Sequence, residues 1–271
     1  MWVTSQSVVK TFYLFGWLAL LGNVACVHKH KGRTSVLGHA EAIVSHFRDG
    51  YDGFRGYFQL LIGPEYKNEK IFNLLYFRTD EVFGYVGLLN YNNSRVFDAH
   101  FSVWNVNSAT PGKGFGCVEF NNGDADRGYK CVKESFPLIR NHIYFVDVEI
   151  TESSIRAYIT SGFESLESRE SFHIQRRLIG SMSYCKGMQN LRPLGYYVHN
   201  IRDRDSCDVA NSLVAVNFAP MQFVQNDFVK HTTLGNAHVF NSKCKDPFVL
   251  IAVAEDKKSV IYFTRPSFVY T

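Results

Sequence analysis

Short apolar runs alternate with turn-forming residues along most of the chain, and sustained helical periodicity is rare. Inside many of these runs apolar and polar side chains alternate, as they do on a strand with one buried face. The pattern predicts strands at about residues 56–62, 71–78, 82–90, 95–104, 114–120, 142–151, 154–161, 174–184, 195–201, 212–218, 237–241, 247–254 and 258–264.

So many strands favour two antiparallel sheets packed face to face, because one isolated sheet would leave its apolar side chains exposed. We therefore expect an all-β fold, a concanavalin-like β-sandwich or jelly roll, in a single domain over residues 56–271. Only residues 40–47 show helical periodicity, and we expect a turn or two of helix there. The stretch 185–207 is either an elaborate loop or a domain boundary.

Composition supports strands and narrows the range of partners. The chain is 46% apolar and 15% aromatic, with 23 Phe and 15 Tyr, and rings favour strands over helices. The formal net charge is +4, and the acids and bases are interspersed. Such a balance indicates neither a nucleic-acid-binding surface nor strong attraction to anionic membranes.

The first residues have the layout of a secretory signal peptide. Lys10 precedes the apolar run TFYLFGWLALLG at 11–22, and small residues follow at Val24 and Cys26. A membrane anchor is the alternative, but a spanning helix needs about 20 apolar residues and this run is shorter. We expect a signal peptide over residues 1–26, an N-terminal segment over 27–55, and a secreted, extracellular product with no membrane insertion after cleavage.

Cysteine usage fits an oxidising compartment. Cys26 leaves with the signal peptide, and an odd number remains, so at least one cysteine is unpaired or bonded to another chain. Cys117 and Cys131 flank a connection rich in Gly and Asp, and we expect a disulfide between them. A zinc site is the alternative, but no two cysteines have the close spacing of zinc ligands. We expect no metal and no cofactor.

One glycosylation sequon occurs, Asn92 followed by Asn93 and Ser94. It lies in an Asn-rich turn between two apolar runs, where a glycan would be tolerated. An unmodified turn that uses Asn for its backbone geometry explains the same residues, and both interpretations stay open.

The segment RVFDAHFSVW at 95–104 carries the most informative chemistry. On a strand, the polar residues of this segment share one face, in a row spaced about 7 Å apart. An apolar ring beside hydrogen-bonding groups suits a sugar, which offers both a C–H face and hydroxyls. In the alternative interpretation Trp104 fills the core and its polar neighbours contact solvent. The predicted ligand-binding residues are Asp98, His100, Ser102 and Trp104.

The same region resembles an extracellular family called domain of unknown function 3472. The resemblance covers residues 84–160 and rests on the order Gly84-Tyr85-Val86-Gly87, Phe101-Ser102-Val103-Trp104-Asn105, Phe115-Gly116 with Glu119, and Ile143-Tyr144-Phe145-Val146. Cys117 and Val118 depart from the Gly-rich loop that follows Phe-Gly in that family. The resemblance implies a secreted β-sandwich that often lies beside carbohydrate-related modules, and it implies no catalytic residues.

Two further motifs give weaker alternatives. Asp147 and Glu149 share one face of the predicted strand 142–151, and paired carboxylates can act as acid and base on a glycosidic bond. Alternating acids on a solvated face explain them more simply. The acidic loop at 121–128 offers oxygens for Ca²⁺ but lacks a closing bidentate Glu, and a tight turn uses the same residues.

Together these patterns predict a secreted binding module rather than an enzyme, whose partner is a carbohydrate or a cell-surface protein. A glycan-active hydrolase that uses Asp147 and Glu149, and a purely structural extracellular protein, are the alternatives.

Overall fold

A computed structural model describes residues 34–43, 51–62, 69–90, 96–121, 127–137, 142–163, 176–184, 191–202, 214–218, 222–225, 228–231, 233–241, 248–253 and 260–265. The described elements all lie between residues 34 and 265. The predicted signal peptide therefore lies outside the described residues. Within them, no helix has the length and apolar character needed to cross a membrane.

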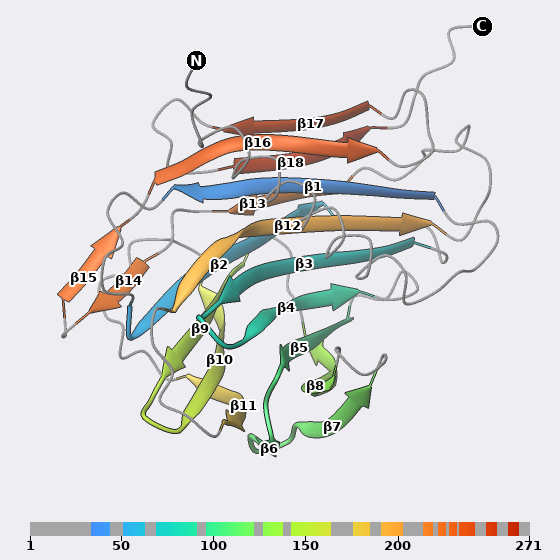
Figure 1. The fold of residues 1–271 in the computed structure, drawn as a ribbon. Helices are drawn as coiled ribbons and strands as arrows, with labels where there is room; N and C mark the ends of the chain where they lie inside the picture. The colour runs from blue at the N-terminus through green and yellow to red at the C-terminus, as the bar shows by residue number, and fades with distance from the viewer. Residues whose placement is uncertain are drawn as a thin grey trace, which may run out of the picture. The chain divides into compact units, whose positions relative to one another are not determined.

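The described residues form strands arranged in two sheets, in which every neighbouring pair of strands is antiparallel (Figure 1). The first sheet has the order β16 (Thr233–Asn241), β1 (Thr34–Ile43), β12 (Arg192–Arg202), β3 (Glu69–Arg78), β4 (Phe83–Asn90), β5 (Val96–Trp104), β8 (Arg127–Pro137) and β7 (Gly116–Asn121).

The second sheet has the order β17 (Phe248–Val253), β18 (Val260–Arg265), β13 (Val214–Phe218), β2 (Gly53–Ile62), β9 (Ile143–Ile150), β10 (Ser154–Phe163), β11 (Arg177–Ser183) and β6 (Ser108–Pro111). The hairpin of β14 (Gln222–Gln225) and β15 (Phe228–His231) pairs with β2 through β14. The predicted all-β sandwich is therefore confirmed.

Each predicted strand overlaps an observed one, but the N-terminal expectation is wrong. Residues 40–43 belong to strand β1 and are not helical, and residues 44–47 lie outside the described residues. β1 pairs with β12 on one side and β16 on the other. Two neighbours that saturate its backbone override a weak local preference for helix, since such preferences are small beside tertiary pairing. Part of the segment 27–55 is thus a strand of the first sheet.

The core lies between the sheets and takes alternate residues from strands of both. From the first sheet it receives Phe77 of β3 and Phe101 of β5, whose ring centroids lie 6.3 Å apart. From the second it receives Phe54 of β2, 5.8 Å from Phe77. The apolar residues of β5, namely Phe97, Ala99, Phe101 and Val103, are all fully buried in this core, as their alternation predicts. The polar residues of β5 therefore lie on the opposite face of the first sheet, which we call the outer face.

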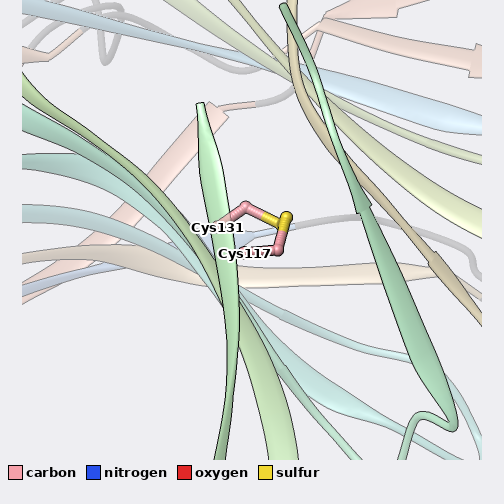
Figure 2. The surroundings of a disulfide bond; sticks show 2 residues. All are labelled: Cys117 and Cys131. Atoms are coloured by element: carbon pink, nitrogen blue, oxygen red, sulfur yellow. A yellow bond between two sulfur atoms is a disulfide. The ribbon is translucent and has the colours of Figure 1, made fainter. Parts of the chain in front are cut away.

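A disulfide joins Cys117 of the edge strand β7 to Cys131 of β8, which confirms the predicted pairing (Figure 2). The two cysteines lie directly opposite each other, with Cα atoms 4.0 Å apart. Cys131 is fully buried in the core and faces Gly180 of β11 in the second sheet. A Cβ atom on Gly180 would lie 2.5 Å from the Cys131 sulfur, so only glycine leaves room for the disulfide between the sheets. The bond anchors the exposed edge strand to the core.

Candidate functional site

The outer face of the first sheet carries a continuous group of aromatic rings, which we call the aromatic patch: Tyr76, Phe83, Tyr85, Trp104 and Phe120. Trp104 lies at its centre, with its ring centroid 5.4 Å from Phe83, 5.8 Å from Tyr85 and 5.2 Å from Phe120. Tyr76 extends the group, at 5.5 Å from both Phe83 and Tyr85. Trp104 is half-buried and does not belong to the core, so the alternative in which it fills the core is not what the structure has.

Strand register explains why these rings meet. Tyr76 lies directly opposite Tyr85, so both side chains project from the same face of the sheet. Tyr85 in turn lies opposite Ser102 of β5, two residues before Trp104, and residues two apart on a strand share a face. The five rings come from four strands, and strand pairing alone brings them together.

A glycine allows Phe120 to reach Trp104 across strand β8. Gly128 pairs with Trp104 on one side and with Phe120 on the other. A Cβ atom on Gly128 would lie 2.7 Å from the Phe120 ring and 2.3 Å from the Val103 carbonyl oxygen. Any other residue there would push the edge ring away from the indole.

Two turns hold the ends of the patch. In the turn between β3 and β4, the Thr79 hydroxyl accepts hydrogen bonds from the backbone N–H groups of Glu81 (3.1 Å) and Val82 (3.0 Å). After Trp104 the chain leaves β5 at Asn105, whose φ of 62° lies in the left-handed region that Asn tolerates better than most residues. The Asn105 backbone N–H donates to the Arg127 carbonyl oxygen at 3.0 Å. These contacts fix where the flanking strands begin and end.

Beside the patch, β5 carries two polar side chains on the outer face, His100 and Ser102, and both are almost completely buried. His100 is 7% exposed and Ser102 is 2% exposed. Neither ring nitrogen of His100 has a hydrogen-bond partner among the described residues. Burial, together with the positive charge of Lys130, lowers the pKa of His100 to about 4, so the imidazole is neutral near pH 7. A neutral imidazole offers one donor and one acceptor to a hydrogen-bonding ligand.

The lowered pKa of His100 predicts that acid destabilises the fold. Between pH 6.5 and 4 the unfolded chain takes up a proton on His100 that the folded protein does not. The contribution of neutral His100 to the free energy of unfolding is therefore complete above pH 6.5 and is lost as the pH falls toward 4. We expect it to reach about 3 kcal/mol. Urea denaturation at pH 7 and pH 4.5 measures the fall in the free energy of unfolding.

In His100→Gln this fall is expected to shrink, because the side chain no longer titrates. In Lys130→Gln it is expected to shrink by a smaller amount, because only a nearby positive charge is removed. Equal falls in wild type and His100→Gln would contradict the assignment.

Asp98 is the predicted binding residue that lies farthest from the aromatic patch. It is half-buried and lies opposite Leu89, on the same face of β5 as Trp104. Six residues separate it from Trp104, which on a strand is about 20 Å. The distance from Trp104 along β5 thus increases in even steps from Ser102 to His100 to Asp98.

The paired acids of β9 belong to an ion-pair network on the outer face of the second sheet. Arg55 of β2 lies directly opposite Asp147, and both side chains are almost completely buried, at 0% and 1% exposed. Arg55 Nε donates to Asp147 Oδ1 at 2.6 Å, and a second guanidinium nitrogen donates to Oδ2 at 2.8 Å. Burial raises the pKa of Asp147, and the pairing with Arg55 works against this rise. Both oxygens of the carboxylate are therefore engaged.

Glu149 is engaged in the same network. Arg176 contacts the Glu149 carboxylate, lies 3.5 Å from Asp147 Oδ2, and stacks over the Tyr158 ring at 4.2 Å from its centroid. Asp147 and Glu149 do share a face, as their spacing predicts, but each is paired with arginine, and only Glu149 is partly exposed. This arrangement favours a structural role for the two acids.

Several predicted features lie outside the described residues, namely Asn92, the cysteines at 185, 207 and 244, and residues 122–126 of the acidic loop at 121–128. In the described part of the chain, no group of three or more His, Cys, Asp or Glu side chains is placed to hold a metal ion. The sequence interpretation missed four rings of the aromatic patch. Tyr85 stood in the motif that carries the family resemblance, but strand register was needed to place it beside Trp104.

Comparisons with known proteins leave the function open. No protein-family model matches the chain, so its resemblance to domain of unknown function 3472 stays a prediction. No curated protein matches it either. Among solved structures, it is similar to the one described as the crystal structure of scytalido-glutamic peptidase with a peptide-based transition-state analogue, with a TM-score of 0.45 and 11% sequence identity. That match covers 84% of this chain and 97% of the peptidase, and likeness at this level carries no argument about activity.

Proposed function

We propose that this protein is a secreted binding module that recognises carbohydrate at the aromatic patch. The observation that carries the proposal is the half-buried Trp104 ring, which lies among three other rings on the face of the first sheet that does not form the core. Sugars bind against such rings through their C–H faces. The Cys117–Cys131 disulfide is compatible with an oxidising, extracellular location.

Polar groups next to the rings support carbohydrate over a purely apolar ligand. Binding sites generally combine apolar surface with a few placed hydrogen-bonding groups. The neutral imidazole of His100 and the hydroxyl of Ser102 lie on the same strand and face as Trp104. A sugar hydroxyl both donates and accepts, and so matches a neutral imidazole.

The alternative, a glycan-active hydrolase, receives no comparable support. Asp147 and Glu149 are paired with Arg55 and Arg176 and lie on the second sheet, whereas the aromatic patch lies on the first. A general acid needs a proton that it can transfer to the leaving group, and a carboxylate held by a bidentate guanidinium is poorly placed to supply one.

Replacing Trp104 with alanine is expected to weaken binding of oligosaccharides by about tenfold, because the loss of a stacking ring costs about 1.4 kcal/mol. A glycan array followed by calorimetry on each hit measures the effect. Trp104→Phe is expected to retain part of the affinity, since it keeps a ring at the centre of the patch.

Phe115 provides the matched control. It is a half-buried aromatic residue outside the patch, and its ring lies 5.9 Å from the Lys133 ammonium. Phe115→Ala is expected to leave binding unchanged. The proposal fails if Trp104→Ala, shown by circular dichroism to be folded, binds every glycan as the wild type does, or if the wild type binds no glycan.

A further inference from the structure

Strand β3 of the aromatic patch, together with the neighbouring strands β12 and β8, places three cations on the outer face of the first sheet. Arg78 of β3 lies directly opposite Phe83, which itself lies next to Trp104. Arg192 of β12 lies directly opposite Arg78. Lys130 of β8 lies directly opposite Ser102. Since neighbouring strands lie about 4.8 Å apart, all three positions fall within about three strands of the Trp104 indole.

In the part of the chain that the structure describes, these three cations have no acidic partner. Arg55, Arg127 and Arg176 each form an ion pair with Asp or Glu. Among the described residues, no carboxylate lies within ion-pair distance of Arg78, Lys130 or Arg192, whose side chains are all half-buried. Partly buried positive charge without a counter-ion is unfavourable, so a bound anion would stabilise this face.

Arg78 and Arg192 place two positive charges directly opposite each other on neighbouring strands. Like charges directly opposite each other on neighbouring strands repel, and such pairs are destabilising. Arg192 Nε is in addition buried with no hydrogen-bond partner among the described residues. A guanidinium binds a carboxylate or sulfate through parallel N–H donors, which would satisfy both the charge and the orphaned donor.

A second buried group, His100, points to a ligand near Lys130. His100 is 7% exposed, and neither of its ring nitrogens has a hydrogen-bond partner among the described residues. Buried polar atoms are normally satisfied, by protein, by water or by a ligand. His100 lies two residues before Ser102, which is directly opposite Lys130, and the positive charge of Lys130 acts on the imidazole.

We propose that the aromatic patch binds a carbohydrate that carries negatively charged groups, either carboxylates or sulfates, with the sugar against Trp104 and the anionic groups on Arg78, Arg192 and Lys130. This inference rests on the proposed carbohydrate recognition and specifies its ligand. Carboxylate and sulfate groups both present negatively charged oxygens on a sugar ring. The probes below distinguish which of the two is bound.

The test is calorimetry on the full-length secreted product with three probes of similar length: a hyaluronan oligosaccharide, a heparin oligosaccharide and a neutral chitin oligosaccharide. We expect at least one anionic probe to bind ten times more tightly than the neutral one, and its affinity to fall as NaCl rises from 50 to 500 mM. Preference for hyaluronan indicates carboxylate recognition, and preference for heparin indicates sulfate recognition.

Charge variants locate the anion. Arg78→Gln and Lys130→Gln are each expected to weaken binding of the preferred anionic probe by about tenfold and to leave binding of the neutral probe unchanged. Arg156→Gln is the matched control, because Arg156 is an exposed arginine on the second sheet, and it is expected to bind as the wild type does.

The outcomes separate this inference from the proposed function. Neutral and anionic probes bound equally, with loss in Trp104→Ala, would overturn the anionic inference and leave carbohydrate recognition intact. No binding of any probe would overturn both. Binding of polyuridylate that is lost in Lys130→Gln but retained in Trp104→Ala would overturn the inference in favour of a general polyanion surface.

Discussion

Replacing Arg55 with methionine is expected to lower the free energy of unfolding by about 3–5 kcal/mol, because it leaves the Asp147 carboxylate buried without its partner. Both side chains are almost completely buried, and two short hydrogen bonds of 2.6 and 2.8 Å join them. Arg176, at 3.5 Å from Asp147, compensates only in part because it also binds Glu149. Urea denaturation of the single variant near pH 7 measures the effect.

The double variant Arg55→Met, Asp147→Leu provides the control. Removing both charges eliminates the unpaired carboxylate, so we expect the double variant to recover much of the stability lost in the single one. Equal stabilities of the single and double variants would show that the loss comes from packing around Arg55, whose guanidinium also lies 5.3 Å from the Phe145 ring centroid, and would contradict the ion-pair account.

Replacing both Cys117 and Cys131 with alanine is expected to lower the free energy of unfolding by about 3 kcal/mol, because the disulfide closes a loop with a sequence separation of 14 and so restricts the unfolded chain. The bond also holds edge strand β7, with Phe120, against β8. Thermal and urea denaturation of the purified variant measure the loss.

Reduction of the wild type with dithiothreitol is expected to cause a similar loss, and reductant is expected to destabilise the double variant less than it destabilises the wild type. A wild type whose stability does not change once both thiols are shown to be free would contradict the prediction. Without the disulfide, strand β7 is held less firmly, and Phe120 on that strand contacts the Trp104 ring. We therefore also expect the double variant to bind glycans more weakly than the wild type.

The sequence predicted the fold class because strand periodicity is a local property. On β5, Phe101 and Val103 alternate with Ser102 and Trp104, and this alone separates the core face from the outer face. The expected helix at 40–47 failed because β1 has neighbours on both sides, which no local pattern reveals. Strand β8 was also missed, since its lysines weaken the apolar signal although Cys131 faces the core.

The candidate site was only half accessible to sequence reasoning. His100, Ser102 and Trp104 could be placed on one face from their spacing within one strand. The rings that surround Trp104 come from β3, β4 and β7, and which of them meet depends on register between strands. The role of Asp147 required Arg55, which is separated from it by 92 residues along the chain.

By itself, the amino-acid sequence determined most of the strands, the two faces of β5 and the pairing of Cys117 with Cys131, because each depends on alternation or spacing within a short stretch of chain. Only the tertiary structure decided which strands are neighbours, and therefore which rings surround Trp104, which cations lack an acid and which acids are paired. The physical reason is that strand order and register are set by long-range hydrogen bonding and core packing, which join residues far apart in the sequence.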